Sequence, residues 1–186
     1  MKVAMQFAMP SELHALPGMK GREPSAVISG IPIYELGPQL IAACGGVGKV
    51  NAAMCAQILC RHFRCDLILN SGVAGCLTDL PIGSLVLAEL GHPAESGRVA
   101  SGDWFAVKGD RAAWIRDTFR PTLTEMEGGA IAQVCLRNGT RFVALKSVSD
   151  HLFSERQAEE YFDFGQALDS LGRVVLPFAR RLVEEG

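Results

Sequence analysis

The sequence predicts an α/β fold: a single-domain three-layer sandwich with a central mixed, mostly parallel β-sheet. Short apolar runs alternate along the chain with longer stretches in which apolar residues recur at helical spacing. The apolar runs are continuous rather than alternating, as strands covered on both faces tend to be. The 186 residues, 48% hydrophobic and 20% charged, suit one globular domain with a sizeable core.

The predicted strands lie at residues 3–8, 39–44, 66–70, 84–89 and 141–149. Helices are predicted between them at 49–63, 110–119 and 128–136, and a long last helix at about 155–184, which Pro177 is expected to kink. Asn138-Gly139 is a typical stop signal before the last strand. Residues 91–103, GHPAESGRVASGD, are predicted as the one extended loop.

Charge and cysteine usage exclude several classes of protein. A net charge of −2 gives no electrostatic reason to expect nucleic acid or an anionic membrane as a partner. The first apolar run is too short to span a membrane and lacks a cleavage signal, so a cytoplasmic protein is expected. The six cysteines form no CxxC pair, and we expect reduced, packed thiols with no metal site and no cofactor.

The segment GGVGK, residues 45–49, invites comparison with phosphate-binding loops. Such a loop needs GxxxxGK followed by Ser or Thr, but Lys49 is followed by Val50, and the GxGxxG spacing is also missing. A tight turn that enters a helix is the favoured interpretation, with Lys49 as a solvated or capping cation.

Three acidic residues, Glu12, Glu127 and Asp150, each follow a predicted strand in an apolar context. Ligands of such sheets bind at the carboxyl ends of the strands. Each acid taken alone is explained by a helix N-cap or first-turn position. Together, three converging carboxylates indicate a site that binds hydroxyl groups and moves protons.

Six segments in order carry a family resemblance: AMPSE (8–12), GGVGKVNAA (45–53), NSGVAGCL (70–77), SGDWF (101–105), EMEGGAIAQVC (125–135) and SVSD (147–150). With them the chain resembles the 5'-methylthioadenosine/S-adenosylhomocysteine nucleosidases of the purine and uridine phosphorylase superfamily, nearly end to end. The resemblance implies the phosphorylase/hydrolase-like fold, a small-molecule nucleoside substrate and a homodimer.

The resemblance also implies roles for individual residues. Glu12 would activate the attacking water, and Asp150, oriented by Ser149, would protonate the purine N7. Glu127 would bind the ribose hydroxyls. Met126 would pack beside the sugar, Phe105 would stack on the base, and Phe162 would help to cover the pocket. Val73, which stands where the family commonly has serine, is also expected beside the substrate.

These residue types suit cleavage of an N-glycosidic bond. The reaction builds positive charge on the ribose and negative charge on the leaving purine. A carboxylic acid kept neutral by burial can protonate the purine, and a carboxylate beside the ribose can stabilise its charge and position water. Phosphorylases of the superfamily carry a Gly-Asp-Pro-x-Arg loop after the first strand, where this chain has Met9-Pro10-Ser11-Glu12. A carboxylate there would repel phosphate, so hydrolysis is favoured over phosphorolysis.

The chain departs from the family pattern in its middle. Near residues 90–101 a long segment that helps to form the dimer surface and the pocket for the 5'-substituent is missing, and Lys146 stands where arginine is usual. Residues 1–186 are thus expected to form one shortened nucleosidase-like domain. The alternatives are a phosphate-dependent phosphorylase, a futalosine-type or adenosyl-lipid nucleosidase, or a non-catalytic nucleoside-binding relative. Trp104 is core or pocket wall, and Glu125 has no assigned role.

Overall fold

The computed structural model describes residues 1–89, 97–105, 109–152 and 162–185. The strands in this part of the chain are β1 (Val3–Phe7), β2 (Ala26–Ile28), β3 (Ile31–Gly37), β4 (Leu40–Cys44), β5 (Leu67–Cys76), β6 (Leu85–Glu89), β7 (Val99–Ser101), β8 (Leu123–Glu125) and β9 (Arg141–His151). The helices are α1 (Pro10–His14), α2 (Lys49–Arg61), α3 (Asp110–Phe119), α4 (Gly128–Asn138) and α5 (Phe164–Glu185).

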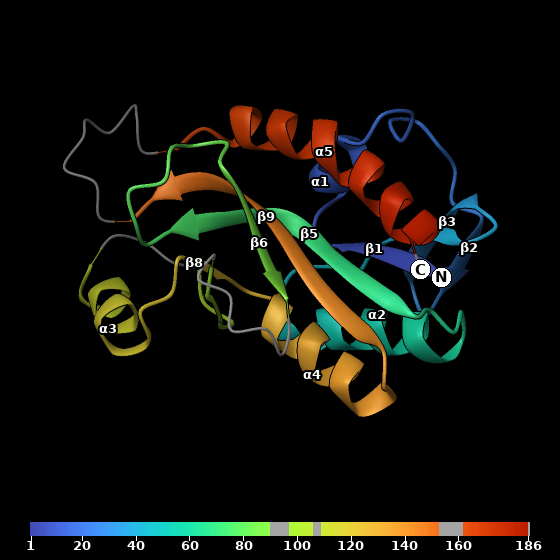
Figure 1. Cartoon of the computed structure of the whole chain (residues 1–186), viewed down its shortest axis with the longest axis horizontal. Coiled ribbons are helices and arrows are strands. Elements are labelled where there is room, and N and C mark those ends of the chain that lie inside the picture. The colour runs from blue at the N-terminus through green and yellow to red at the C-terminus, as the bar shows by residue number, and fades with distance from the viewer. Residues whose placement is uncertain (90–96, 106–108, 153–161, 186) are drawn as a thin grey trace.

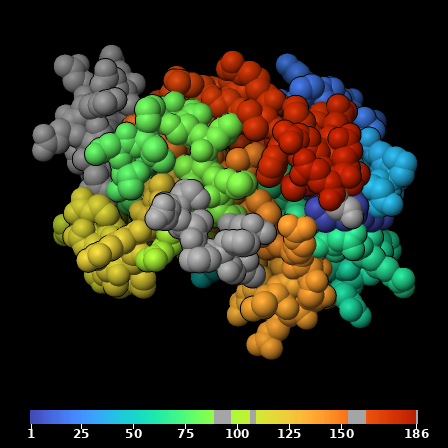
Figure 2. All heavy atoms as spheres, in the orientation of Figure 1, coloured from blue at the N-terminus to red at the C-terminus, as the bar shows by residue number. Residues whose placement is uncertain are grey.

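All the strands belong to one mixed sheet with helices on both faces (Figure 1). The centre, β4-β1-β5-β9, is parallel, while β3 on β4, β6 on β9 and β8 on β5 are antiparallel. Helices α1 and α5 cover one face, and α2 and α4 cover the other. The space-filling view shows α5 in red and α4 in orange on opposite sides of the molecule (Figure 2). The predicted three-layer α/β fold is therefore confirmed.

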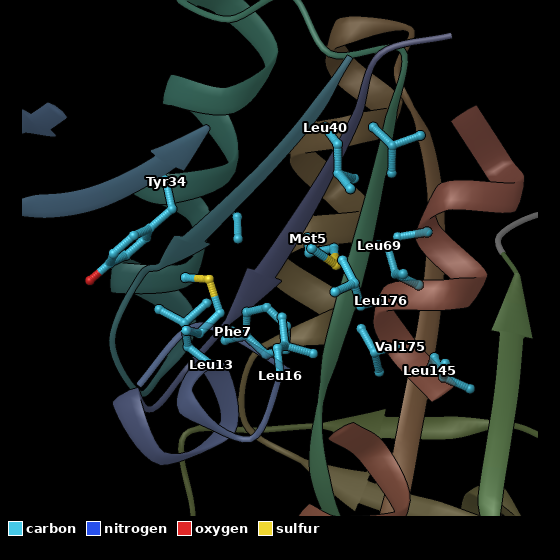
Figure 3. Close-up of a cluster of buried hydrophobic side chains, with 14 of the residues drawn as sticks. Met5, Phe7, Leu13, Leu16, Tyr34, Leu40, Leu69, Leu145, Val175 and Leu176 are labelled. Carbon is cyan, nitrogen blue, oxygen red and sulfur yellow. The ribbon is translucent and has the colours of Figure 1, made fainter. Parts of the chain in front are cut away.

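Each face of the sheet has its own apolar core. Under α1 and α5, buried side chains of the central strands meet Leu13 of α1, Leu16 just after it, and Val175 and Leu176 of α5 (Figure 3). Under α2 and α4, small side chains such as Ala52 and Ala56 allow the helices to approach the sheet closely. Two covered faces explain why the central strands are continuously apolar in sequence.

Strand β5 changes its neighbour along its length, and this change opens the site. Residues Val3 to Gln6 of β1 pair with Leu67 to Asn70 of β5. Beyond the end of β1, β8 takes the same side of β5, but only at Gly75 and Cys76. The stretch 71–74 thus has no strand partner on that side in the described ladders, and a crevice forms beyond the carboxyl end of β1.

The last ladder contains a register shift. Ala74 of β5 pairs with Val148 of β9, but the next pair is Gly75 with Asp150. Ser149 is consequently an extra residue with no partner on β5, which is a β-bulge.

Several predicted bounds differ from the structure. The strand predicted at 66–70 is longer in the structure, because residues 70–76 of the segment NSGVAGCL continue β5. Parallel pairing with β9, which extends to His151, holds this stretch as a strand although its glycines have low strand propensity. Two short strands, β2 and β8, and the longer β3 were missed. The predicted loop at 91–103 contains β7, and its residues 91–96 lie outside the described residues.

The helices agree better with the prediction. Helix α3 has the predicted bounds, and α2 and α4 differ by two residues at one end. The last helix begins at Phe164, and the first part of its predicted range, at 155–161, lies outside the described residues. Pro177 lies inside α5, which continues to Glu185.

Candidate active site

A cavity of about 210 Å³ occupies the crevice between β1, β5 and β8. Its described lining combines four carboxylates, a serine and a threonine with apolar groups, and contains no lysine or arginine. The lining residues are Ala8, Met9, Glu12, Val47, Val73, Ala74, Gly75, Trp104, Phe105, Thr124, Glu125, Met126, Glu127, Ser149 and Asp150.

Glu12 lies in the gap that β8 leaves beside β5. Its Oε2 accepts the backbone N–H groups of Ala8 (3.0 Å) and Met9 (2.9 Å), and its Oε1 accepts that of Val73 (2.9 Å). Burial raises the pKa of the carboxyl above its ordinary value, against the opposing effects of Lys146 and the three N–H donors. The predicted first-turn role of Glu12 is thus present, but the contact with Val73 on another strand goes beyond it.

Gly72 makes this position of Glu12 sterically feasible. A Cβ atom at Gly72 would overlap the Glu12 carboxylate. Glycine, which has no Cβ, leaves room for the carboxylate against the strand.

Glu127 is the N-cap residue of α4 and also contacts the start of α2. Its Oε1 accepts the N–H of Gly48 at 2.8 Å, and Gly48 is the residue before α2 begins. Burial raises the pKa of Glu127, while the Gly48 N–H and the charge of Lys146 lower it. The GGVGK turn therefore contributes a backbone donor that holds this acid.

Glu125, which had no assigned role, is a buried member of an ion pair. Lys146 Nζ lies 3.3 Å from its Oε2, and the two side chains are 3% and 1% exposed. Oε2 also accepts the N–H groups of Glu127 (3.0 Å) and Gly128 (2.7 Å). Burial alone would raise the pKa of Glu125, but Lys146, the Ser101 hydroxyl and these N–H groups together lower it below its ordinary value.

Asp150 reaches the cavity from the bulge in β9. The Ser149 hydroxyl donates to Asp150 Oδ1 at 2.6 Å, which is the contact expected of a residue that orients the acid. Burial raises the pKa of Asp150, and Ser149 and His151 only partly offset this. Asp150 therefore favours its neutral, proton-donating form more than an exposed aspartate does.

The remaining predicted site residues divide into two groups. Val73, Met126 and Phe105 line the cavity, and Phe105 remains 70% exposed. Phe162 lies outside the cavity lining and is 56% exposed; its backbone bridges Asp150 and its ring stacks on Phe164. Trp104, for which core and pocket wall were both open, lines the cavity.

Residues that the sequence reasoning missed are Val47, Thr124 and the buried pair Glu125–Lys146. One sequence signal could have revealed the pair: Lys146 interrupts a strand that is otherwise apolar, and a lysine buried there requires an anionic partner.

The described residues offer neither a metal site nor a membrane-spanning helix. In residues 1–89, 97–105, 109–152 and 162–185, no three His, Cys, Asp or Glu side chains are grouped so that they could hold a metal ion. No helix within these ranges has the length and apolar character needed to cross a membrane. All six cysteines are buried free thiols.

Known proteins share both the sequence and the fold. Residues 3–90 and 86–184 match the model of the phosphorylase superfamily. A 5'-methylthioadenosine/S-adenosylhomocysteine nucleosidase of Geobacillus kaustophilus (strain HTA426) is 32% identical over an alignment that covers 81% of this chain and 84% of the relative.

Two solved structures extend the similarity to three dimensions. A 5'-methylthioadenosine/S-adenosylhomocysteine nucleosidase of Colwellia psychrerythraea 34H, in complex with adenine, superposes with a TM-score of 0.78 at 26% identity, over 98% of this chain and 96% of that chain. The futalosine hydrolase of Helicobacter pylori strain 26695 has the same fold, with a TM-score of 0.79 at 21% identity, over 100% and 98% of the two chains.

The six sequence segments meet around one cavity, and the matches run almost from end to end of the chain. The chain belongs to the phosphorylase superfamily and, within it, to the family of the 5'-methylthioadenosine/S-adenosylhomocysteine nucleosidases.

Proposed function

We propose that this protein, a hydrolytic purine nucleosidase by family, uses Glu12, Glu127 and Asp150 to cleave the N-glycosidic bond of an adenosine-type ribonucleoside. The observation that supports these assignments is one cavity lined by carboxyl groups at two separate positions of the sheet. Glu12 lies beyond β1, and Asp150 lies near the end of β9.

In the proposed reaction, Glu12 accepts a proton from water while the water oxygen bonds to C1' of the ribose. The bond from C1' to N9 breaks, and the proton of Asp150 moves to N7 of the leaving purine. The products are the free base and the free sugar. A raised pKa helps Asp150 to be protonated, and the three N–H groups around Glu12 help that carboxylate to remain an acceptor.

The other site residues bind the substrate in this proposal. The unpaired side of the Glu127 carboxylate accepts hydrogen bonds from the ribose hydroxyls, with Met126 and Val73 against the sugar. Phe105 stacks on the base, Ser149 orients Asp150, and Phe162 covers the mouth of the pocket. The support is that five of these six residues line the cavity.

Water is the proposed nucleophile rather than phosphate. Phosphate binding needs cationic side chains or clustered backbone donors near the nucleophile. The described lining of the cavity contains neither lysine nor arginine, and the N–H groups beyond β1 donate to Glu12 instead.

Methylthioadenosine or S-adenosylhomocysteine is the first substrate to test, because the relatives carry these compounds in their names. A futalosine-type nucleoside follows, because a futalosine hydrolase has the same fold. An adenosyl-lipid nucleoside is a further candidate if the predicted shortening near residues 90–101 leaves the 5'-end of the pocket open.

The test is release of free base from methylthioadenosine, adenosine and futalosine, each with and without inorganic phosphate, by the wild-type protein and by Glu12→Gln and Asp150→Asn. Phosphate-independent release that both substitutions reduce is the expected result. Release that requires phosphate would identify a phosphorylase. Binding without cleavage would identify a non-catalytic relative, and unchanged hydrolysis in both variants would remove the assigned mechanism.

Three further properties are part of the proposal. We propose that residues 1–186 form one shortened nucleosidase-like domain, that it works as a homodimer, and that it is cytoplasmic. Limited proteolysis, analytical ultracentrifugation and cell fractionation test them in turn.

A further inference from the structure

Lys146 is a buried cation that the proposed mechanism does not use. It lies on β9 opposite Gly72 of β5 and Val86 of β6, and its side chain is 3% exposed. It is not among the described residues that line the cavity. It forms an ion pair with Glu125, which does line the cavity.

Glu125 connects this lysine to the first turn of α4. Its Oε2 accepts the N–H groups of Glu127 and Gly128, and its Oε1 accepts the Ser101 hydroxyl. The Ser101 oxygen in turn accepts the N–H of Gly129 at 2.7 Å. Three consecutive N–H groups at the helix start are thus held by one carboxylate and its serine partner.

The charge of Lys146 also acts on the two other glutamates of the site. Its attraction lowers the pKa of Glu12 and of Glu127, in each case against the larger effect of burial. Three glutamates from α1, β8 and the start of α4 therefore share one nearby lysine.

Among the residues that the structure describes, the other titratable groups near this cluster do not replace that lysine. Cys44 of β4 lies near Glu12, and burial, with the charge of Glu12, raises the pKa of its thiol so that it stays neutral. Asp150 and its neighbour His151 lie further along β9 and interact with each other.

We propose that Lys146 is a positioning residue: its buried charge holds Glu125 beneath the first turn of α4 and keeps Glu12 and Glu127 able to act as hydrogen-bond acceptors. The inference rests on the proposed function, because it assigns Lys146 a role through the residues that would contact water and ribose. A purely structural role is the alternative to this proposal. A buried ion pair with only a structural role can often be replaced by apolar groups with no loss of stability.

If Lys146 is a positioning residue, removing either charge of the pair should shift the ionisation of Glu12, and the two single changes should shift it in opposite directions. Lys146→Met removes the cation, so Glu12 should remain protonated to higher pH. Glu125→Gln leaves the cation with fewer anions around it, so Glu12 should ionise at lower pH. The double variant removes one positive and one negative charge and should return Glu12 close to its original behaviour.

The experiment measures the pH profile of kcat/KM for methylthioadenosine hydrolysis in the full-length protein. For Lys146→Met we expect the acid limb to move up by about one pH unit, the size typical of one nearby charge. For Glu125→Gln we expect it to move down. Lys146→Arg keeps the positive charge and should leave the acid limb where it lies in the wild type. The acid limb of the double variant should lie between those of the two single variants. Lys20→Met, at an exposed lysine, is the matched control.

Circular dichroism and urea unfolding accompany each profile, so that a misfolded variant is not counted. If Lys146→Met fails to fold, Glu125→Gln and the double variant still carry the test. Acid limbs that coincide with wild type in all folded variants would overturn the role of Lys146. A wild-type protein that cleaves no nucleoside would overturn the proposed function instead.

Discussion

The two ends of the cavity hold their carboxyl groups in different ways. At the end proposed for the sugar, Glu12 accepts three backbone N–H groups, Glu127 accepts another, and Lys146 lies nearby. At the end proposed for the base, Asp150 accepts a hydrogen bond from the Ser149 hydroxyl and interacts with His151, which follows it in the chain.

The difference teaches how one cavity can favour opposite protonation states. Burial raises the pKa at both ends, but only the sugar end is supplied with N–H dipoles and a lysine that stabilise negative charge. The base end lacks that compensation in the described residues, which suits a group that must carry a proton. Four substitutions test this contrast.

Asp150→Asn is expected to have the largest effect. Asparagine cannot deliver a proton to the purine, so kcat should fall by roughly 10²- to 10⁴-fold, the range for loss of a general acid or base. Substrate affinity should change much less. Rapid-quench measurement of base release, together with binding of an inert nucleoside analogue, separates the two quantities.

The same variant should gain stability at neutral pH. Because burial raises the pKa of Asp150 in the folded state, the folded protein loses stability as pH rises from the unfolded pKa through the folded one. Asparagine has no such cost, so its free energy of unfolding should exceed that of wild type at neutral pH and match it in acid. A variant less stable than wild type at neutral pH would show that ionised Asp150 does not lower the stability of the folded protein.

Glu127→Ala tests the sugar end. Hydrogen bonds to a charged group contribute about 1.5–3 kcal/mol, so affinity for a ribonucleoside should fall roughly 10- to 100-fold. Titration calorimetry against the ribonucleoside and its 2',3'-dideoxy analogue gives the readout, since only the first should lose affinity. Glu35→Ala, at an exposed glutamate, is the control. Near-normal ribonucleoside affinity would remove Glu127 from the site.

Gly72→Ala tests whether packing fixes Glu12. The new methyl group would overlap the Glu12 carboxylate, so overpacking should cost about 1–3 kcal/mol of stability and kcat should fall. Gly37→Ala adds the same methyl group where nothing lies within 4 Å, and its stability should stay within about 0.5 kcal/mol of wild type. Equal effects of the two changes in urea unfolding would contradict the tight fit of Glu12.

Phe105→Ala should have the smallest effect. Aromatic stacking contributes about 0.5–1.5 kcal/mol, and the ring of Phe105 is largely exposed to solvent. The KM should therefore rise by only about 2- to 10-fold, with kcat preserved. Phe119→Ala, on α3 and outside this cavity, is the matched control for steady-state kinetics. A large fall in kcat would mean that the ring also positions the base for protonation.

The fold could be predicted well where periodicity is strong. The bounds of β1, β4 and α2 follow closely from apolar spacing, because side chains of all three pack in the two cores. The carboxyl end of β5 could not be predicted, because Gly72 and Gly75 have low strand propensity and are held by pairing with β9, far away in the sequence.

The site was only partly predictable from residues alone. Position at an expected strand end in an apolar context singled out Glu12, Glu127 and Asp150, and all three line the cavity, although β8, which precedes Glu127, was missed as a strand. The role of Glu125 could not be assigned, because it depends on Lys146, which is 21 residues away in the chain and becomes a neighbour only when β8 and β9 both join β5.

The bulge at Ser149 makes the position of Asp150 depend on how many residues precede it, and not only on which residue it is. Side chains alternate sides along a strand. Removing Ser149 would therefore restore an uninterrupted ladder and move each later side chain of β9 to the opposite side of the sheet. A relative that kept every residue type but lost this one position would keep the aspartate in its alignment and present it to the wrong face. In proteins descended from this one, a single-residue deletion in β9 is therefore a more informative sign of lost activity than a substitution near Asp150.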